Sequence, residues 1–195
     1  DKLAGHLCVQ WAEAFGVPAG IPIAVGMIDA HSGAVGSGVG AGRMVSIIGT
    51  SGCDIMAAPA VGEMPDIPGI CGIVNGSVLP GYFGFEGGQA AVGDSFFWQA
   101  STVCGIDPKG YAAIEREAGA LKPGASGLVA LDWLNGNRNP YCDPQLSGLM
   151  LGMTLHTTPA ELYRAWIEAA AYGVRQIVEL LRDGGVEIDE IICCG

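Results

Sequence analysis

The sequence predicts an α/β fold, a mixed sheet flanked by helices, and three observations support this prediction. Short apolar runs at 21–28 and 44–48 have the length and boundaries of buried strands. A further run of this kind lies at 188–194. Residues 158–183 carry an amphipathic helix that opens with a Thr-Pro-Ala-Glu capping box and has proline at its first position. Many of the chain's 32 glycines lie at turns and strand ends, as expected of an α/β protein with tight connections.

The other expected elements follow from periodicity and turn residues. In chain order, we expect a helix over 3–15, a Gly/Ala-rich crossing over 33–42, a hairpin over 44–58, short strands at 72–74 and 77–79 around an Asn-Gly turn, a helix opening at 86–89 and running to about 103, a helix over 111–121 and a strand over 127–131.

The charge balance excludes several classes of partner. Nine basic residues stand against twenty acidic residues, which gives a net charge of −11, and the basic residues form no cluster. Nucleic acid and membrane surfaces both require a basic footprint, so neither is an expected partner. An anionic substrate such as ATP would have to be bound locally, by backbone N–H groups and metal ions. No apolar run is long enough to span a bilayer.

Cysteine and histidine usage indicates the redox compartment. The seven cysteines are odd in number and include no C-x-x-C pair, and the three histidines show no H-x-x-x-H spacing. A disulfide framework and a zinc site are therefore disfavoured, and no protein metal ligands are expected. A reducing cytoplasm is the simpler inference.

Two features are candidates for chemistry. Asp29 ends the apolar run at 21–28, where a carboxylate lies at the ligand-binding edge of an open α/β sheet. The turn Gly49-Thr50-Ser51-Gly52 follows the next run and offers backbone N–H groups and two hydroxyls for phosphate oxygens. Together they suggest phosphoryl transfer, with Asp29 accepting a proton from the attacking hydroxyl. Alone, Asp29 is equally a turn former or helix cap, and the glycines equally a plain hairpin.

Five segments resemble the FGGY carbohydrate kinases, and two of them resemble the ribulokinase subgroup more than glycerol or xylulose kinases. These segments lie at 25–31, 46–54, 68–72, 85–94 and 131–138; Glu-Gly-Gly-Gln and Asp-Trp-Leu-Asn-Gly-Asn-Arg carry the subgroup likeness. The resemblance implies an actin-like ATPase of two ribonuclease H-like domains, truncated here at both ends. Residues 1–40 would be the tail of the N-terminal, sugar-binding domain, and 41–195 most of the C-terminal, ATP-binding domain.

The resemblance also implies a reaction and its residues. It implies ATP-dependent phosphorylation of a ketopentose in arabinose catabolism, L-ribulose to L-ribulose 5-phosphate, with Mg²⁺ carried on ATP. Asp29 would be the catalytic base and contact the sugar, Gly49 to Gly52 would bind the ATP phosphates, and Glu86 would bind the sugar. The plain alternative for Glu86 is a helix cap. We expect a homo-oligomer, and no activity from this chain alone.

Two other functional classes remain open from the sequence. The same fold serves non-catalytic actin-like modules, since fold does not fix function. Thr50-Ser51-Gly52-Cys53 has some likeness to the nucleophile elbow of hydrolases, but Cys53 occupies the position where that motif requires glycine.

Overall fold

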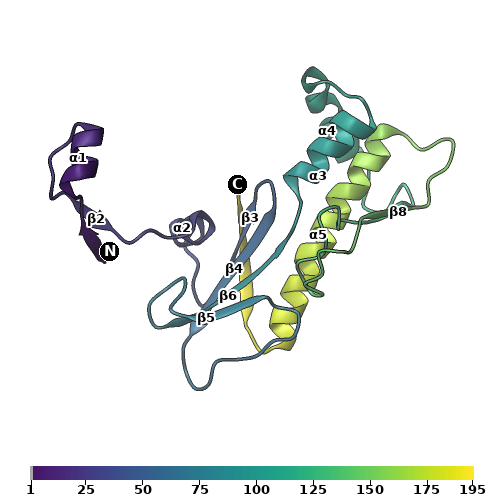
Figure 1. The fold of residues 1–195 in the computed structure, drawn as a ribbon. Coiled ribbons are helices and arrows are strands. Elements are labelled where there is room, and N and C mark those ends of the chain that lie inside the picture. The colour runs from purple at the N-terminus through teal and green to yellow at the C-terminus, as the bar shows by residue number, and fades with distance from the viewer. Residues whose placement is uncertain (1) are drawn as a thin grey trace.

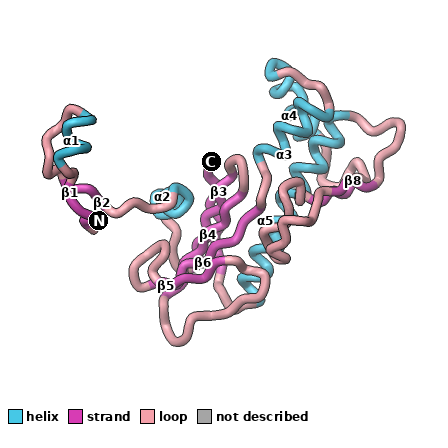
Figure 2. Tube along the Cα trace, in the orientation of Figure 1, coloured by secondary structure: helices cyan, strands magenta, loops and turns pink. Residues whose placement is uncertain are grey.

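The computed structural model describes residues 2–195, and its N-terminal segment stands apart from the main body (Figures 1 and 2). This segment contains strand β1 (Leu3–His6), helix α1 (Val9–Phe15) and strand β2 (Pro22–Ala24), with β1 and β2 antiparallel. The expected helix over 3–15 is therefore wrong in its first half, because pairing with β2 outweighs the helical spacing of Leu3 and Leu7. The expected strand over 21–28 is shorter than predicted.

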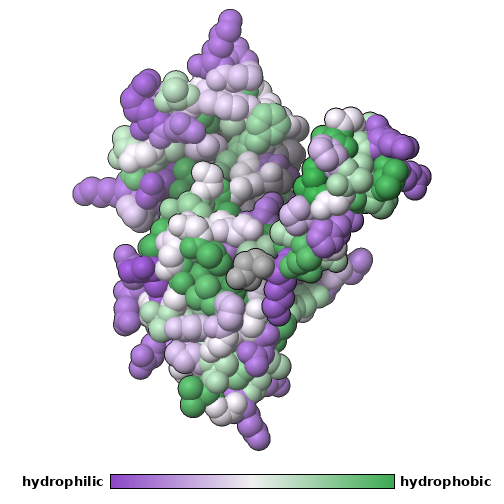
Figure 3. Space-filling view, turned by 90° about the vertical axis from the view of Figure 1, so that its left-hand side faces the viewer, coloured by the Kyte–Doolittle hydropathy of each residue, from purple (hydrophilic) through white to green (hydrophobic). Residues whose placement is uncertain are grey.

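Apolar side chains lie exposed on this N-terminal segment. Trp11 and Phe15 stack on each other with ring centroids 5.5 Å apart, and both remain more than half exposed. The segment lies on the side of the molecule that faces the viewer in Figure 3, where apolar and polar patches alternate over the surface. No helix within residues 2–195 has the length and apolar character needed to cross a membrane.

A short helix, α2 (Asp29–Gly36), replaces part of the crossing expected over 33–42. Its Gly and Ala residues suggested a crossing between strands, but they let the helix lie close against the sheet. Ala34 is fully buried in an apolar cluster with Val45 and Ile55, and Gly33 lies against Ile47. Helix α2 therefore packs on the sheet although it precedes residue 41.

The central sheet has five strands in the order β5-β6-β4-β3-β9. Antiparallel pairing joins β5 (Gly72–Asn75), β6 (Tyr82–Gln89), β4 (Gly52–Pro59) and β3 (Gly42–Ile48), whereas β9 (Ile188–Cys194) runs parallel to β3. The predicted hairpin over 44–58 and the strand over 188–194 are confirmed. The strand expected at 77–79 is wrong, because β5 pairs with β6. The helix expected to open at 86–89 is also wrong there, because these residues are strand.

Side-chain alternation along the strands assigns each residue to one of two faces. One face carries Met44, Met56 and Phe85 under helix α5 (Pro159–Asp183). The other carries Val45 and Ile55 under α2. Since successive strand residues point to opposite faces, the polar residues of β4 and β6 are divided between the two helices.

Helix α5 is the longest element and is fixed by several other segments. Its capping box is formed, with Thr158 accepting from the Glu161 amide and Glu161 accepting from the Thr158 amide. Beside one end of α5 lie α3 (Gly93–Trp98), the π-helical turn η1 (Gln99–Val103), the 3-10 turn η2 (Pro108–Gly110) and α4 (Tyr111–Ala120). A two-stranded sheet of β7 (Val129–Leu131) and β8 (Leu149–Leu151) packs beside them.

Gly87 permits close packing of α5, and this makes a stability prediction. A Cβ atom at Gly87 would lie 2.7 Å from Ile177 Cγ2. We expect Gly87→Ala to lower the free energy of unfolding by about 1–3 kcal/mol, because the helix must move away from β6. The exposed helical position Gly119 has nothing within 4 Å, so Gly119→Ala should raise it by about 0.5–1 kcal/mol. Urea unfolding of this chain measures both, and two changes of equal sign would contradict the packing argument.

Candidate functional site

The turn between β3 and β4 presents free backbone donors. Gly49, Thr50 and Ser51 are exposed at the tip, beyond the last ladder pair of Ile48 with Gly52. The Gly49 amide donates to the Ser51 carbonyl at 3.0 Å. Within residues 2–195, the Thr50 and Ser51 amides donate to no backbone carbonyl. Two adjacent free amides and two hydroxyls are a suitable arrangement for an anion.

The beginning of α3 holds this turn in place. The Val92 amide donates to the Thr50 carbonyl at 2.9 Å, and the Gly93 amide donates to the Gly49 carbonyl at 2.9 Å. A Cβ atom at Gly93 would lie 2.7 Å from the Gly49 carbonyl oxygen, so only glycine permits this approach. The carbonyl oxygens of Gly49 and Thr50 are therefore hydrogen-bonded to the beginning of α3. Gly52, by contrast, is buried beside Gln89 and Val92.

Asp29 is the first residue of α2, and its side chain is exposed. Its Oδ1 accepts from the Ala30 amide at 2.8 Å. Asp29 thus bonds nearby backbone, as the turn-former alternative expects, but it is not the helix cap, because Ile28 holds the N-cap position of α2. Two residues further along α2, His31 is buried and points to the sheet, where its Nε2 lies 3.0 Å from Glu86 Oε2.

Glu86 lies at the centre of a polar cluster on the face of the sheet that α2 covers. Its Oε2 contacts His31, and its Oε1 accepts from Arg138 Nη2. Cys53 Sγ, on the neighbouring strand β4, lies 3.7 Å from Oε1. Glu86 is therefore no helix cap: it is a strand residue, partly exposed, with a donor on each carboxylate oxygen.

Arg138 is positioned by a loop with buried asparagines. Asn139 accepts from the Gly88 amide at 2.8 Å and donates to the Gly69 carbonyl at 2.5 Å, which ties the loop to β6. Asn137 accepts from the Tyr141 amide at 2.9 Å. Both asparagines are buried, so the residue between them has little freedom at its backbone.

The charges around Glu86 set its ionisation and that of Cys53. Burial raises the pKa of the Glu86 carboxyl, but the hydrogen bond with His31 and the Arg138 guanidinium outweigh burial, so the pKa lies below its usual value. Burial and the Glu86 charge raise the pKa of the Cys53 thiol to about 11. Cys53 is therefore a neutral thiol at pH 7 and adds no negative charge beside Glu86.

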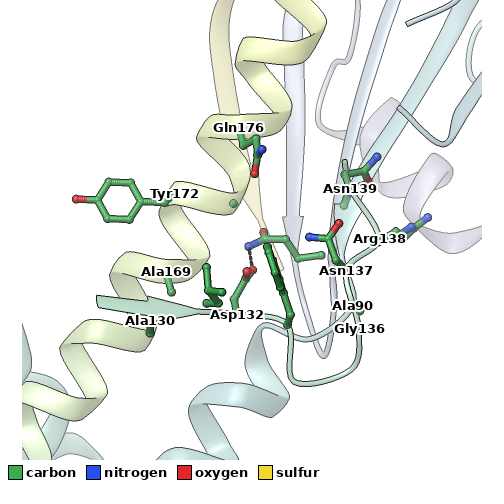
Figure 4. A pocket seen from close by; sticks show the side chains of 15 residues that line it. Ala90, Ala130, Asp132, Gly136, Asn137, Arg138, Asn139, Ala169, Tyr172 and Gln176 are labelled. Atoms are coloured by element: carbon green, nitrogen blue, oxygen red, sulfur yellow. Dashed lines mark hydrogen bonds between the residues drawn. The ribbon is translucent and has the colours of Figure 1, made fainter. Parts of the chain in front are cut away.

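A small cavity of about 90 Å³ lies behind this cluster, between α5 and the loop at 136–139 (Figure 4). Gln89 donates to Asp132 Oδ2 at 2.6 Å and to the Ala170 carbonyl at 2.8 Å. Burial raises the pKa of the Asp132 carboxyl, although the Gln89 hydrogen bond acts against it. These bonds tie the end of β6 to α5 and to the loop that follows β7. They thereby support the turn between β3 and β4, whose last residue, Gly52, pairs with Gln89.

The structure brings some of the expected residues together. Glu86 and the helix that begins at Asp29 meet through His31, whereas the Asp29 carboxylate itself contacts neither Glu86 nor the Thr50–Ser51 amides among the described hydrogen bonds. His31 and Arg138 are the functional candidates that sequence reasoning missed. Both lie inside segments that resemble the family, but nothing local indicates that they meet on one carboxylate.

Comparison with known proteins identifies the class. Residues 44–195 match the C-terminal domain of the FGGY family of carbohydrate kinases. The match covers most of the chain, and the chain belongs to this family. The expected mixed sheet flanked by helices is confirmed.

The names of individual relatives are more specific than the family. Ribulokinases from Halalkalibacterium halodurans and Shouchella clausii have 44% and 42% sequence identity to this chain, in alignments that each cover 98% of it. The crystal structure of a xylulose kinase from Rhodospirillum rubrum superimposes on 98% of this chain with a TM-score of 0.78 and 26% identity, and 38% of that protein is covered. The chain spans about a third of the length of these relatives, 35% and 36% for the two ribulokinases.

A buried carboxyl near the cluster predicts a pH effect on stability. Asp54 on β4 is 1% exposed, opposite Ser46 on β3, and neither of its oxygens has a hydrogen-bond partner within residues 2–195. Burial raises the pKa of Asp54, and the nearby Ser46 hydroxyl and Arg138 offset only part of this effect. The folded state therefore holds a proton that the unfolded state loses above about pH 4.

We expect the stability of the unsubstituted chain to fall, through Asp54, as pH rises from about 4 toward the raised pKa. Asp54→Asn has no such titration. The free energy of unfolding of this variant should therefore increase relative to that of the unsubstituted chain over the same pH range. Urea unfolding between pH 4 and 8 measures the difference, with Asp66→Asn on an exposed loop as control. A difference that is constant with pH would contradict the role of Asp54.

Proposed function

We propose that this chain is the nucleotide-binding part of a sugar kinase, together with the helix that carries the catalytic base. The reaction is ATP-dependent phosphorylation of a ketopentose, L-ribulose to L-ribulose 5-phosphate. The observation that carries the proposal is the convergence of α2 and Glu86 on the same end of the sheet as the free amides of the turn. The family and the ribulokinase names of relatives support the reaction class.

The turn fits the phosphates of a nucleotide. In this proposal the Thr50 and Ser51 amides and hydroxyls donate to phosphate oxygens, and Gly49 leaves the approach open. Gly52 acts from within the strand, as the buried end of the turn. Mg²⁺, carried by ATP, would neutralise charge on the phosphates; within residues 2–195, no group of three or more His, Cys, Asp or Glu side chains is arranged to hold a metal.

Asp29 and Glu86 have different tasks in the proposed reaction. Asp29 is exposed and would accept the proton of the attacking sugar hydroxyl, which requires the carboxylate form. Glu86 would accept a hydrogen bond from another hydroxyl, and its lowered pKa keeps it ionised at neutral pH. Phosphoryl transfer depends mainly on such positioning, so groups that fix the sugar contribute directly to rate. Residues 1–40 and 41–195 would belong to the two domains of the enzyme, in the cytoplasm.

Replacement of the proposed base tests the reaction. In the full-length protein that carries this segment, Asp29→Asn should lower kcat roughly 10²–10⁴-fold and leave ATP binding unchanged, because the amide accepts no proton. A coupled ADP assay with L-ribulose, D-ribulose and the xyluloses measures turnover and identifies the sugar. Asp66→Asn is a matched control. Near-normal turnover by Asp29→Asn would remove Asp29 from the mechanism.

The phosphate turn has its own test. Gly49→Val places a branched side chain at the exposed tip beside Ser51, where a Cβ atom lies 3.6 Å from the Ser51 carbonyl oxygen. We expect nucleotide affinity to fall at least tenfold, which corresponds to about 1.4 kcal/mol. Calorimetry with ATP and Mg²⁺ measures it, and Gly119→Ala, at an exposed position of helix α4, controls for general effects. Unaltered affinity would count against phosphate binding at this turn.

A further inference from the structure

We propose that His31 and Arg138 are positioning residues that fix the Glu86 carboxylate for a sugar hydroxyl, an inference that rests on the proposed function. Each oxygen of Glu86 has a separate donor. His31 Nε2 is 3.0 Å from Oε2, and Arg138 Nη2 donates to Oε1. An ionised carboxylate only accepts, so His31 presents its Nε2–H to it. Two donors on two oxygens prevent rotation of the carboxylate plane, while further lone pairs stay available for a substrate.

The two donors reach Glu86 from opposite parts of the chain. His31 is 55 residues before Glu86 and belongs to α2, the helix that begins at Asp29. Arg138 is 52 residues after Glu86 and belongs to the loop held by Asn137 and Asn139. His31 therefore links the helix of the proposed base to the Glu86 carboxylate, which is proposed to bind the sugar. A displacement of α2 would move Asp29 and His31 together, since both lie on this helix.

Exposure argues that this cluster orients Glu86 more than it stabilises the fold. The side chains of Glu86 and Arg138 are 27% and 34% exposed, and ion pairs in contact with solvent contribute little to stability. The surroundings are otherwise short of cations. From the elements packed around it, the Glu86 carboxylate faces His31 of α2, Arg138 and the Cys53 thiol, while the Cys71 thiol donates to the Glu86 backbone carbonyl.

Loss of Arg138 should therefore have a pH signature as well as an effect on affinity. Of the two donors on the Glu86 carboxylate, His31 would be the remaining partner able to carry positive charge. The pKa of Glu86 would rise, and the acid limb of the kcat/KM profile for the sugar would move to higher pH. A residue with a merely structural role would not move that limb.

The experiment uses the full-length protein and four variants: Arg138→Gln, Arg138→Lys, Glu86→Gln and the double variant of Glu86→Gln with Arg138→Gln. We expect Arg138→Gln to raise the sugar KM roughly ten- to hundredfold, as for loss of a hydrogen bond to a charged group, with the ATP KM and the thermal midpoint unchanged. The double variant should be no worse than Glu86→Gln alone, since Arg138 acts through Glu86. Arg175→Gln, which removes an exposed ion pair on α5, is the matched control.

Arg138→Lys and two changes at His31 complete the test. Lysine keeps the charge, so the acid limb should return toward its original position even if the sugar KM stays raised. His31→Gln keeps a donor and should affect the sugar KM less than His31→Leu does.

Additive losses in the double variant, or an acid limb that Arg138→Gln leaves in place, would overturn the inference. If Arg138→Gln proves unstable, the His31 pair decides, and equal sugar KM values for His31→Gln and His31→Leu would overturn it. No sugar-dependent ATP consumption by the unsubstituted protein would instead contradict the proposed function.

Discussion

The direction in which Glu86 points follows from how closely helix α5 packs on strand β6. Gly87 lies directly beneath Ile177, and Phe85 is buried in the same apolar cluster under α5. Because neighbours along a strand point to opposite faces, Glu86 between them must face α2. The apolar packing of one helix thus decides which helix can reach the carboxylate, and the polar cluster forms on the side that α5 leaves open.

Elements with strong local signals could be predicted from the sequence, and those shaped by distant contacts could not. Helix α5 has its capping box, and the β3–β4 hairpin has a glycine-bracketed turn, so both were predicted. Helix α2 was missed because its glycine and alanine residues are typical of an irregular crossing, although Ala34 needs that small size to be buried against the sheet.

The glycines of β6 misled for a related reason. Gly87 and Gly88 suggested the opening of a helix, but each accommodates close contact from a distant segment, Gly87 with Ile177 of α5 and Gly88 with the Gly52 carbonyl. The roles of His31 and Arg138 were hidden similarly. Glu86 was expected to bind a sugar by family resemblance, whereas its two donors become visible only when segments more than fifty residues away fold onto it.

Strand register sets the geometry of the site, and local donors reconcile an acidic chain with the proposed anionic substrate. Gly52 pairs with Gln89, so Glu86 lies three residues from the turn, roughly 10 Å along β6 at about 3.3 Å per residue. Backbone amides at the turn supply donors without adding net charge, and one guanidinium compensates Glu86. Local donors of this kind make a general positive field unnecessary, and sheet pairing fixes the backbone of Glu86 relative to the turn.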